Sequence, residues 1–208
     1  MAIKPLTPAA VGEFERFIGR GGVAVFPADT VYGLACNPGS PSSIGRMLGL
    51  KGREQGRPSA VMFFQLDRLL TALDWLGSET VDAIGRLLPG PLTLVVPNPS
   101  GRYALAGGTG LGIRVPRLEG PLEPLAGARV AVLQTSANPS GGTDARRVSD
   151  IVTEIVDGVD IVLDGGELTG IPSTVVGLTG YEQDGSWEVL RETAVPRARV
   201  AELLGEGT

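Results

Sequence analysis

The chain has 208 residues and a formal net charge of −5, with 42% hydrophobic and 20% charged residues. This length and composition predict one globular domain spanning residues 1–208. Histidine is absent, which excludes Ser-His-Asp and Cys-His catalysis and any histidine-ligated metal. The single cysteine excludes an internal disulfide and a thiolate zinc site.

The net negative charge argues against a protein whose main function is to bind nucleic acid, because basic residues are needed to neutralise the phosphates. The N-terminal stretch has no long apolar run of the kind found in signal peptides, and no segment approaches the roughly 20 apolar residues of a membrane span. A single cysteine also fits a reducing compartment. We therefore expect a cytoplasmic protein that makes no contact with a membrane.

Hydrophobic periodicity and turn residues predict the elements in chain order. Thr7 followed by Pro8 is typical of an N-cap and a first helical position, and paired glycines at 21 and 22 end that helix. The further elements expected in the first half are a strand at 23–26, a loop or helix start at 29–33, a helix capped by Ser42 or Ser43 that ends near Lys51, a strand at 60–64, and helices at 66–76 and 78–88.

The second half of the chain is predicted to hold more strands than helices. The expected strands lie at 92–96, 112–115, 130–135, 161–163, 174–178 and 187–190, and the expected helices lie at 148–155 and 196–204. Strands and helices are mixed without strict alternation. The sequence therefore predicts the α/β fold class, with one twisted, partly mixed sheet flanked by helices.

The two standard nucleotide-binding signatures are missing from the sequence. No G-x-x-x-x-G-K-[ST] segment is present, which excludes a P-loop, and the glycines at 107–112 do not form G-x-G-x-x-G after a strand. A ligand site must therefore be sought among Lys, Arg, hydroxyl, amide and carboxylate side chains.

A basic segment follows the helix that ends near Lys51. Lys51, Arg53 and Arg57 are close in sequence and are bracketed by glycines. Lysine as a point charge and arginine as a bidentate fork are both suited to binding phosphates. The same segment also fits a solvated basic helix end that complements the helix dipole, and the segment alone does not separate these two interpretations.

Small polar residues follow the apolar strand at 130–135. Ser136 and Asn138 come at its carboxyl end, where ligands of open α/β sheets tend to bind. They also suit turns in which Ser and Asn side chains bond to the neighbouring backbone. Thr30 and Ser173 likewise stand at junctions where a cap or turn role is common.

Two arginines interrupt apolar strands. Arg114 lies within Gly-Ile-Arg-Val, and Arg191 directly follows Val-Leu. An arginine in such a position needs an anionic partner or exposure to water. Together with Lys51 and Arg53, the two arginines predict an anion-binding pocket in an otherwise acidic protein.

Six segments, taken in order, resemble the YrdC-like family of threonylcarbamoyl-AMP synthases. They read PADTVYGLAC, KGREQGRPSAV, LPGPLTLVV, GIRVP, TSANPSGG and PSTVVGL, and they are spread over most of the chain. The length is similar to that of the short, single-domain members. The resemblance implies a concave α/β fold around a positively lined cavity. The sequence itself shows no dedicated carboxylate cage for a metal ion.

The resemblance also implies an activity. It is that of a nucleotidyltransferase that makes threonylcarbamoyl-AMP and pyrophosphate from L-threonine, bicarbonate or CO₂, and ATP. Mg²⁺ would enter with ATP. A separate tRNA threonylcarbamoyl transferase complex would use the product to modify tRNA, and this chain would bind tRNA weakly or not at all.

The roles that the resemblance implies fall on polar residues of the matching segments. They are catalysis and phosphate binding for Lys51 and Arg53, further ATP contacts for Arg57, Ser136, Asn138 and Arg191, and threonine binding for Thr30, Arg114, Ser136 and Ser173. If Lys51 and Arg53 meet the reacting phosphates, replacing either with alanine should lower turnover by at least about tenfold.

The chain departs from the family's motifs at several positions, more of them on the threonine side than on the nucleotide side. They are Ala28, Glu54, Ser59, Met62, Gly177 and Glu192. Two alternatives therefore stay open. One is a non-catalytic RNA-binding or ribosome-associated relative of the same fold, and the other is an enzyme that adenylates another carbamoyl donor, such as carbamoyl phosphate.

Overall fold

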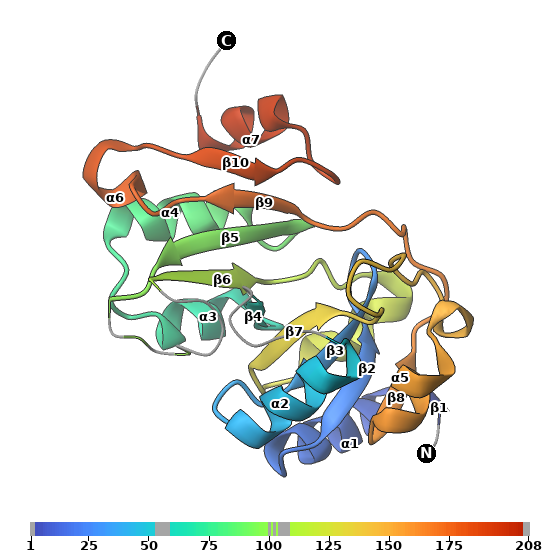
Figure 1. The fold of residues 1–208 in the computed structure, drawn as a ribbon. Coiled ribbons are helices and arrows are strands. Elements are labelled where there is room, and N and C mark those ends of the chain that lie inside the picture. The colour runs from blue at the N-terminus through green and yellow to red at the C-terminus, as the bar shows by residue number, and fades with distance from the viewer. Residues whose placement is uncertain (1–2, 53–58, 100, 102, 104–108, 206–208) are drawn as a thin grey trace.

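The computed structural model describes residues 3–52, 59–99, 101, 103 and 109–205. Its strands join into one open sheet in the order β1-β8-β2-β3-β7-β4-β6-β5-β9-β10. Helices lie against this sheet along its length (Figure 1). The predicted α/β class, with a mixed sheet flanked by helices, is confirmed.

The elements have the following bounds. The strands are β1 (Ile3–Pro5), β2 (Val23–Pro27), β3 (Tyr32–Cys36), β4 (Ala60–Met62), β5 (Leu92–Pro97), β6 (Gly110–Arg114), β7 (Val132–Ser136), β8 (Ile161–Asp164), β9 (Thr174–Gly177) and β10 (Glu188–Arg191). The helices are α1 (Pro8–Gly19), α2 (Pro41–Leu50), α3 (Leu66–Ala72), α4 (Ser78–Leu87), α5 (Thr153–Gly158), α6 (Tyr181–Asp184) and α7 (Arg197–Leu204), with 3₁₀ segments η2 (Gly120–Gly127) and η3 (Val148–Asp150).

The sheet is mixed. β8 runs parallel to β1 and β2, β4 runs parallel to β6, and β5 runs parallel to β9, while the other neighbouring pairs are antiparallel. Figure 1 shows the strand direction turning between the half with β2, β3 and β7 and the half with β5, β6 and β9. β4 joins the two halves by pairing with β7 on one side and β6 on the other.

Alternating side chains of β2 supply two cores, as expected for an extended strand. Val23 and Val25 belong to the larger core, which includes side chains of α2 and α5. Ala24 and Phe26 belong to the smaller core with Phe14 of α1, whose ring centroid lies 5.8 Å from that of Phe26. Because both faces are covered, β2 is buried along its whole length and reads as a continuous apolar run.

The half of the sheet with β5, β6 and β9 uses its two faces differently. Leu94 and Ile113 point into the larger core, where they join Ile84 of α4. Their neighbours along the strands, among them Thr93 and Gly112, face the other way and line a cavity. Because successive side chains of a strand point to opposite faces of the sheet, one face is covered by helices and the other is available to a ligand.

The structure has two strands that the sequence does not predict. β3 falls where a loop or helix start is expected, because Tyr-Gly-Leu-Ala-Cys contains few strong strand formers. It is buried throughout and pairs with β2 on one edge and β7 on the other. β1 is a short edge strand that pairs with β8. Tertiary pairing thus outweighs local propensity in both strands.

The N-terminal caps agree with prediction in one helix and differ in another. Thr7 caps α1 as expected, with its Oγ1 accepting the Ala10 N–H at 3.2 Å. Ser40 caps α2, so the expected cap at Ser42 or Ser43 is wrong. Ser43 Oγ is engaged elsewhere, because it donates to the Gly21 carbonyl at 2.7 Å.

The expected single helix at 148–155 is also wrong. The structure has η3 followed by α5, because the Asp150 carboxylate accepts the backbone N–H groups of Arg146 and Arg147 and closes a separate turn. Other bounds shift by a few residues: α3 ends at Ala72, β4 ends at Met62, β6 begins at Gly110 and β7 begins at Val132. Among the described residues, no helix has both the length and the apolar character needed to cross a bilayer.

Cys36 gives a direct test of this packing. It is fully buried in β3, and burial raises the pKa of its thiol to about 12. Because the thiolate is the reactive form, the native protein should not react with Ellman's reagent at pH 8, whereas the urea-unfolded protein should titrate its single thiol. Rapid labelling of the native protein would contradict the buried position of β3.

Candidate functional site

The free face of β5, β6 and β9 borders a cavity of about 820 Å³. Further wall residues come from β4, β7 and β10 and from the segments that follow β2 and α2. The cavity brings together seven of the predicted site residues: Thr30, Lys51, Arg114, Ser136, Asn138, Ser173 and Arg191. The remaining two, Arg53 and Arg57, lie outside the described residues.

Lys51 ties the end of α2 to the polar segment that follows β7. Its ammonium Nζ donates to Ser136 O at 2.6 Å, to Asn138 O at 2.7 Å and to Asn138 Oδ1 at 2.9 Å. The backbone adds a contact, because Ser140 N donates to Lys51 O at 2.9 Å. Lys51 is only 4% exposed, so the interpretation as a solvated helix end does not hold for this residue.

The polar segment after β7 closes on itself through side-chain hydrogen bonds. Asn138 Oδ1 accepts from Ser136 Oγ at 2.6 Å as well as from Lys51, and Asn138 Nδ2 donates to Gly142 O. Gly141 has a φ of 81°, a left-handed conformation that glycine adopts without strain. The predicted turn contacts are therefore present, and Ser136 and Asn138 also line the cavity. The Ser136 hydroxyl keeps lone pairs with which it can accept hydrogen bonds.

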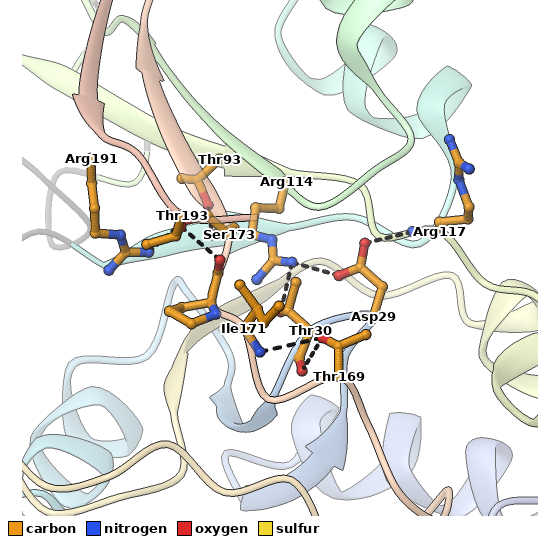
Figure 2. Close-up of polar contacts among 11 residues, drawn as sticks. Asp29, Thr30, Thr93, Arg114, Arg117, Thr169, Ile171, Ser173, Arg191 and Thr193 are labelled. Atoms are coloured by element: carbon orange, nitrogen blue, oxygen red, sulfur yellow. Dashed lines mark hydrogen bonds and ion pairs between the residues drawn. The ribbon is translucent and has the colours of Figure 1, made fainter. Parts of the chain in front are cut away.

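Arg114 ends β6 and lies buried against the loop between β2 and β3 (Figure 2). Its Nη2 donates to Asp29 Oδ1 at 2.6 Å and to Thr30 Oγ1 at 3.2 Å. Its Nε is buried and has no hydrogen-bond partner. The anionic partner that an arginine in an apolar strand requires is thus supplied by a carboxylate of the same chain.

Burial acts in opposite directions on the two members of this pair. Burial lowers the pKa of Arg114, and the nearby charge of Arg191 lowers it further, while Asp29 opposes both effects. Burial raises the pKa of Asp29, and Arg114 and the Arg117 backbone N–H oppose that change. Each charge therefore favours the ionised form of the other against the effect of burial.

Arg191 and Ser173 lie on the opposite side of Arg114 from Asp29 in Figure 2. Arg191, at the end of β10, donates from Nη2 to Ser173 O at 2.7 Å. Ser173 Oγ and Thr93 Oγ1 share a buried hydrogen bond of 2.8 Å. The bond to Ser173 holds Arg191 next to the start of β9 and brings a second guanidinium into the cavity wall.

The charge of the cavity wall opposes the acidic character of the chain. Lys51, Arg114 and Arg191 line the cavity, whereas its described wall contains one carboxylate, that of Asp144. Such a wall favours a ligand that carries several anionic groups. Within the described ranges, no group of three or more Cys, Asp or Glu residues is placed to hold a metal ion.

The cavity also contains polar residues that are not predicted from the sequence. Thr93 interrupts the apolar strand Leu-Thr-Leu-Val-Val in the same way as Arg114 interrupts β6, and that interruption was the available signal. Ser140 and Asp144 lie in the loop beyond Asn138, where polar residues are ordinary and carry no such signal.

Two departures from the family's motifs lie in the core rather than at the cavity. Ala28 and Met62 are buried in the smaller core, and neither belongs to the described cavity wall. Ser59 does line the cavity, and Glu54 lies outside the described residues. The substitutions at Ala28 and Met62 therefore place no side chain on the described wall of the cavity.

Comparisons of the sequence with known proteins agree with one another. A family model, Sua5_yciO_yrdC, described as telomere recombination, matches residues 16–193. A threonylcarbamoyl-AMP synthase from Hahella chejuensis is 32% identical over 156 residues, which cover 74% of this chain and 84% of that protein. A threonylcarbamoyl-AMP synthase from Pyrococcus abyssi is 28% identical over 193 residues, which cover 91% of this chain, but the chain spans only 56% of that relative's length.

Solved structures show the same fold. The crystal structure of Pyrococcus abyssi Sua5 complexed with L-threonine superposes with a TM-score of 0.81 at 25% identity, covering 99% of this chain and 62% of that one. The solution structure of MTH1692 from Methanobacterium thermoautotrophicum superposes with a TM-score of 0.64 at 30% identity, covering 95% of this chain and 92% of that one.

Proposed function

Since the chain belongs to the Sua5/YciO/YrdC family, we propose that it is a threonylcarbamoyl-AMP synthase, a nucleotidyltransferase that joins L-threonine, bicarbonate or CO₂, and ATP. Relatives of this chain carry that enzyme name. The observation that carries the proposal is the convergence of Lys51, Arg114 and Arg191 on one cavity of about 820 Å³. Cavities of roughly 300–1,000 Å³ are usual for small-molecule sites.

The proposed reaction needs no nucleophile from the protein. The amine of threonine loses a proton and captures CO₂ as a carbamate. A carbamate oxygen then bonds to the α-phosphorus of ATP, and the bond from that phosphorus to the departing pyrophosphate breaks. Catalysis then consists of positioning and of stabilising the phosphate charge, so the absence of histidine is no obstacle.

The amino-acid end of the cavity is assigned to the Arg114 region. Arg114 retains an unsatisfied buried Nε–H, and the hydroxyls of Thr30 and Ser173 lie in the same part of the wall. A guanidinium binds a carboxylate well in this setting because the hydrogen bonds are charge-assisted. The related Sua5 from Pyrococcus abyssi was crystallised with L-threonine, which supports an amino acid as one substrate.

The nucleotide end is assigned to Lys51, Ser136, Asn138 and Arg191. Lys51 contributes its charge and also holds Ser136 and Asn138 in place through its three hydrogen bonds. Arg191 adds a second guanidinium to the cavity wall. Arg53 and Arg57 join this group on the basis of the sequence pattern alone.

Mg²⁺ belongs to the proposal as the ion that accompanies ATP. Protein-held Mg²⁺ uses oxygen ligands, and Asp144 is the carboxylate that the described wall offers, so the phosphates would supply most of the ligands. When bound, the ion neutralises phosphate charge. We further propose that the product passes to a tRNA threonylcarbamoyl transferase complex in the cytoplasm, and that this chain itself does not bind tRNA strongly.

Pyrophosphate release in the presence of Mg²⁺, ATP, bicarbonate and threonine tests the proposal. We expect release to depend on threonine and to fall to background without it. Release with carbamoyl phosphate in place of threonine would assign a different carbamoyl donor. Folded protein that releases pyrophosphate with neither compound, but binds tRNA in a salt-sensitive manner, would replace the enzyme with an RNA-binding protein.

A further inference from the structure

We propose that Asp29 is a positioning residue that fixes the Arg114 guanidinium for the carboxylate of the amino-acid substrate, an inference that rests on the function proposed above. Asp29 itself is not among the residues assigned to either substrate. The loop between β2 and β3 carries Asp29 next to Thr30, so one short segment contacts Arg114 through two side chains.

Asp29 is held at both of its carboxylate oxygens. Oδ1 accepts Arg114 Nη2 at 2.6 Å, and Oδ2 accepts the Arg117 backbone N–H at 3.0 Å (Figure 2). The side chains of Asp29 and Arg114 are 7% and 4% exposed. An asparagine at position 29 would turn an N–H₂ group toward one of these two donors, so the arrangement specifically requires a carboxylate.

The ion pair spans the wall between two cavities. Arg114 lines the main cavity, whereas Asp29 lines a second cavity of about 600 Å³, and Thr30 lines both. Asp29 is therefore behind Arg114 as seen from the main cavity and does not belong to its described wall. Asp29 would therefore affect a ligand in the main cavity indirectly, by fixing the orientation and the charge of Arg114.

Arg114 keeps hydrogen-bonding capacity after it has satisfied Asp29. The two Nη2 contacts go to Asp29 and Thr30, and the Nε–H is buried without a partner. Nη1 makes no hydrogen bond to any residue in the described part of the chain. A buried guanidinium with donors still free is suited to a ligand carboxylate, which accepts at two oxygens.

The second arginine of the cavity explains why a counter-charge is needed. Burial is the main cause of the lowered pKa of Arg114, and the positive charge of Arg191 acts in the same direction as a smaller effect. Without Asp29, the Arg114 side chain would be drawn toward whichever anion is nearest, including the phosphates of the nucleotide. Asp29 instead holds Arg114 at the amino-acid end and leaves Arg191 for the nucleotide.

Asp160 provides a matched control for a purely structural role. Its carboxylate also accepts one backbone N–H, that of Val23 at 2.8 Å, and one arginine, Arg46 Nη1 at 2.7 Å. Neither Asp160 nor Arg46 belongs to the described wall of the main cavity. Asp160→Asn therefore removes the same kind of carboxylate–arginine ion pair at a position where no substrate contact is assigned.

Steady-state kinetics of Asp29→Asn test the proposal. We expect the KM for threonine to rise at least about tenfold while the KM for ATP stays within about twofold of the wild type. Asp160→Asn should leave both KM values within about twofold. In an Arg114→Lys background, adding Asp29→Asn should raise the threonine KM by less than about threefold, because the guanidinium that Asp29 positions is already gone.

Equal increases in both KM values, or a full effect of Asp29→Asn in the Arg114→Lys background, would overturn the proposal. If Asp29→Asn does not fold, Asp29→Glu keeps the charge but displaces it, and an unchanged threonine KM in that variant would overturn the proposal equally well. A wild type that shows no turnover would refute the proposed function instead. Calorimetric titration of wild type and Asp29→Asn with threonine would then make the same comparison without catalysis.

Discussion

Replacing Arg114 with methionine is expected to lower the free energy of unfolding by about 3–5 kcal/mol and to abolish threonine-dependent turnover. The buried Asp29 carboxylate loses its ion-pair partner Arg114 in this variant and is left with backbone donors such as the Arg117 N–H. An uncompensated buried charge is among the largest single-residue costs that a fold can carry. Urea unfolding at neutral pH, followed by tryptophan fluorescence, measures the stability loss.

Two variants separate this effect from the general cost of losing an arginine. Arg46→Met breaks the pair with Asp160, in which the arginine side chain is 43% exposed, and should cost no more than about 1 kcal/mol. Adding Asp29→Asn to Arg114→Met should restore part of the lost stability, since no buried charge is then left unpaired. A loss in Arg114→Met no larger than that in Arg46→Met would contradict the structure's account of this pair.

Replacing Lys51 with methionine should lower turnover by at least about tenfold and the free energy of unfolding by about 2–3 kcal/mol. In this variant, three oxygen atoms lose the ammonium donor that they share: Ser136 O, Asn138 O and Asn138 Oδ1. The segment after β7 would then lose the contacts that hold it at the nucleotide end. Pyrophosphate release and urea unfolding on the same preparations measure the two losses.

Lysine substitutions elsewhere and at the same position supply the controls. Lys4→Met removes a partly exposed pair with Glu13 and should leave turnover unchanged. Lys51→Arg keeps the charge but replaces a compact ammonium by a planar fork, so it should not restore activity. Turnover near that of the wild type in Lys51→Met would show that the basic segment has only a structural role.

The fold class and seven of the cavity-lining residues could be predicted because their signals are local. Polar residues at the ends of apolar strands, such as Ser136 and Asn138, and an arginine inside one, Arg114, are visible in the sequence itself. β3 could not be predicted in the same way, because its buried Gly, Ala and Cys residues gain their strand conformation from pairing with β2 and β7.

The partners of the cavity's cations could not be predicted at all. Asp29 and Arg114 are 85 positions apart, and each has a plausible separate role when it is considered alone. Lys51 is predicted to meet phosphates as a point charge, yet its ammonium also bonds backbone and side-chain oxygens 85 and 87 positions away. Contacts between distant segments depend on how the sheet pairs, which local patterns do not encode.

Detection of the product itself tests the central claim most directly. The protein is incubated with Mg²⁺, ATP, threonine and ¹³C-labelled bicarbonate. The nucleotides are then separated, and their masses are determined by mass spectrometry. We expect an adenylate that contains threonine and carries the label, and that disappears when any one of the three substrates is omitted. Folded protein that binds ATP but yields no labelled, threonine-containing adenylate would contradict that claim.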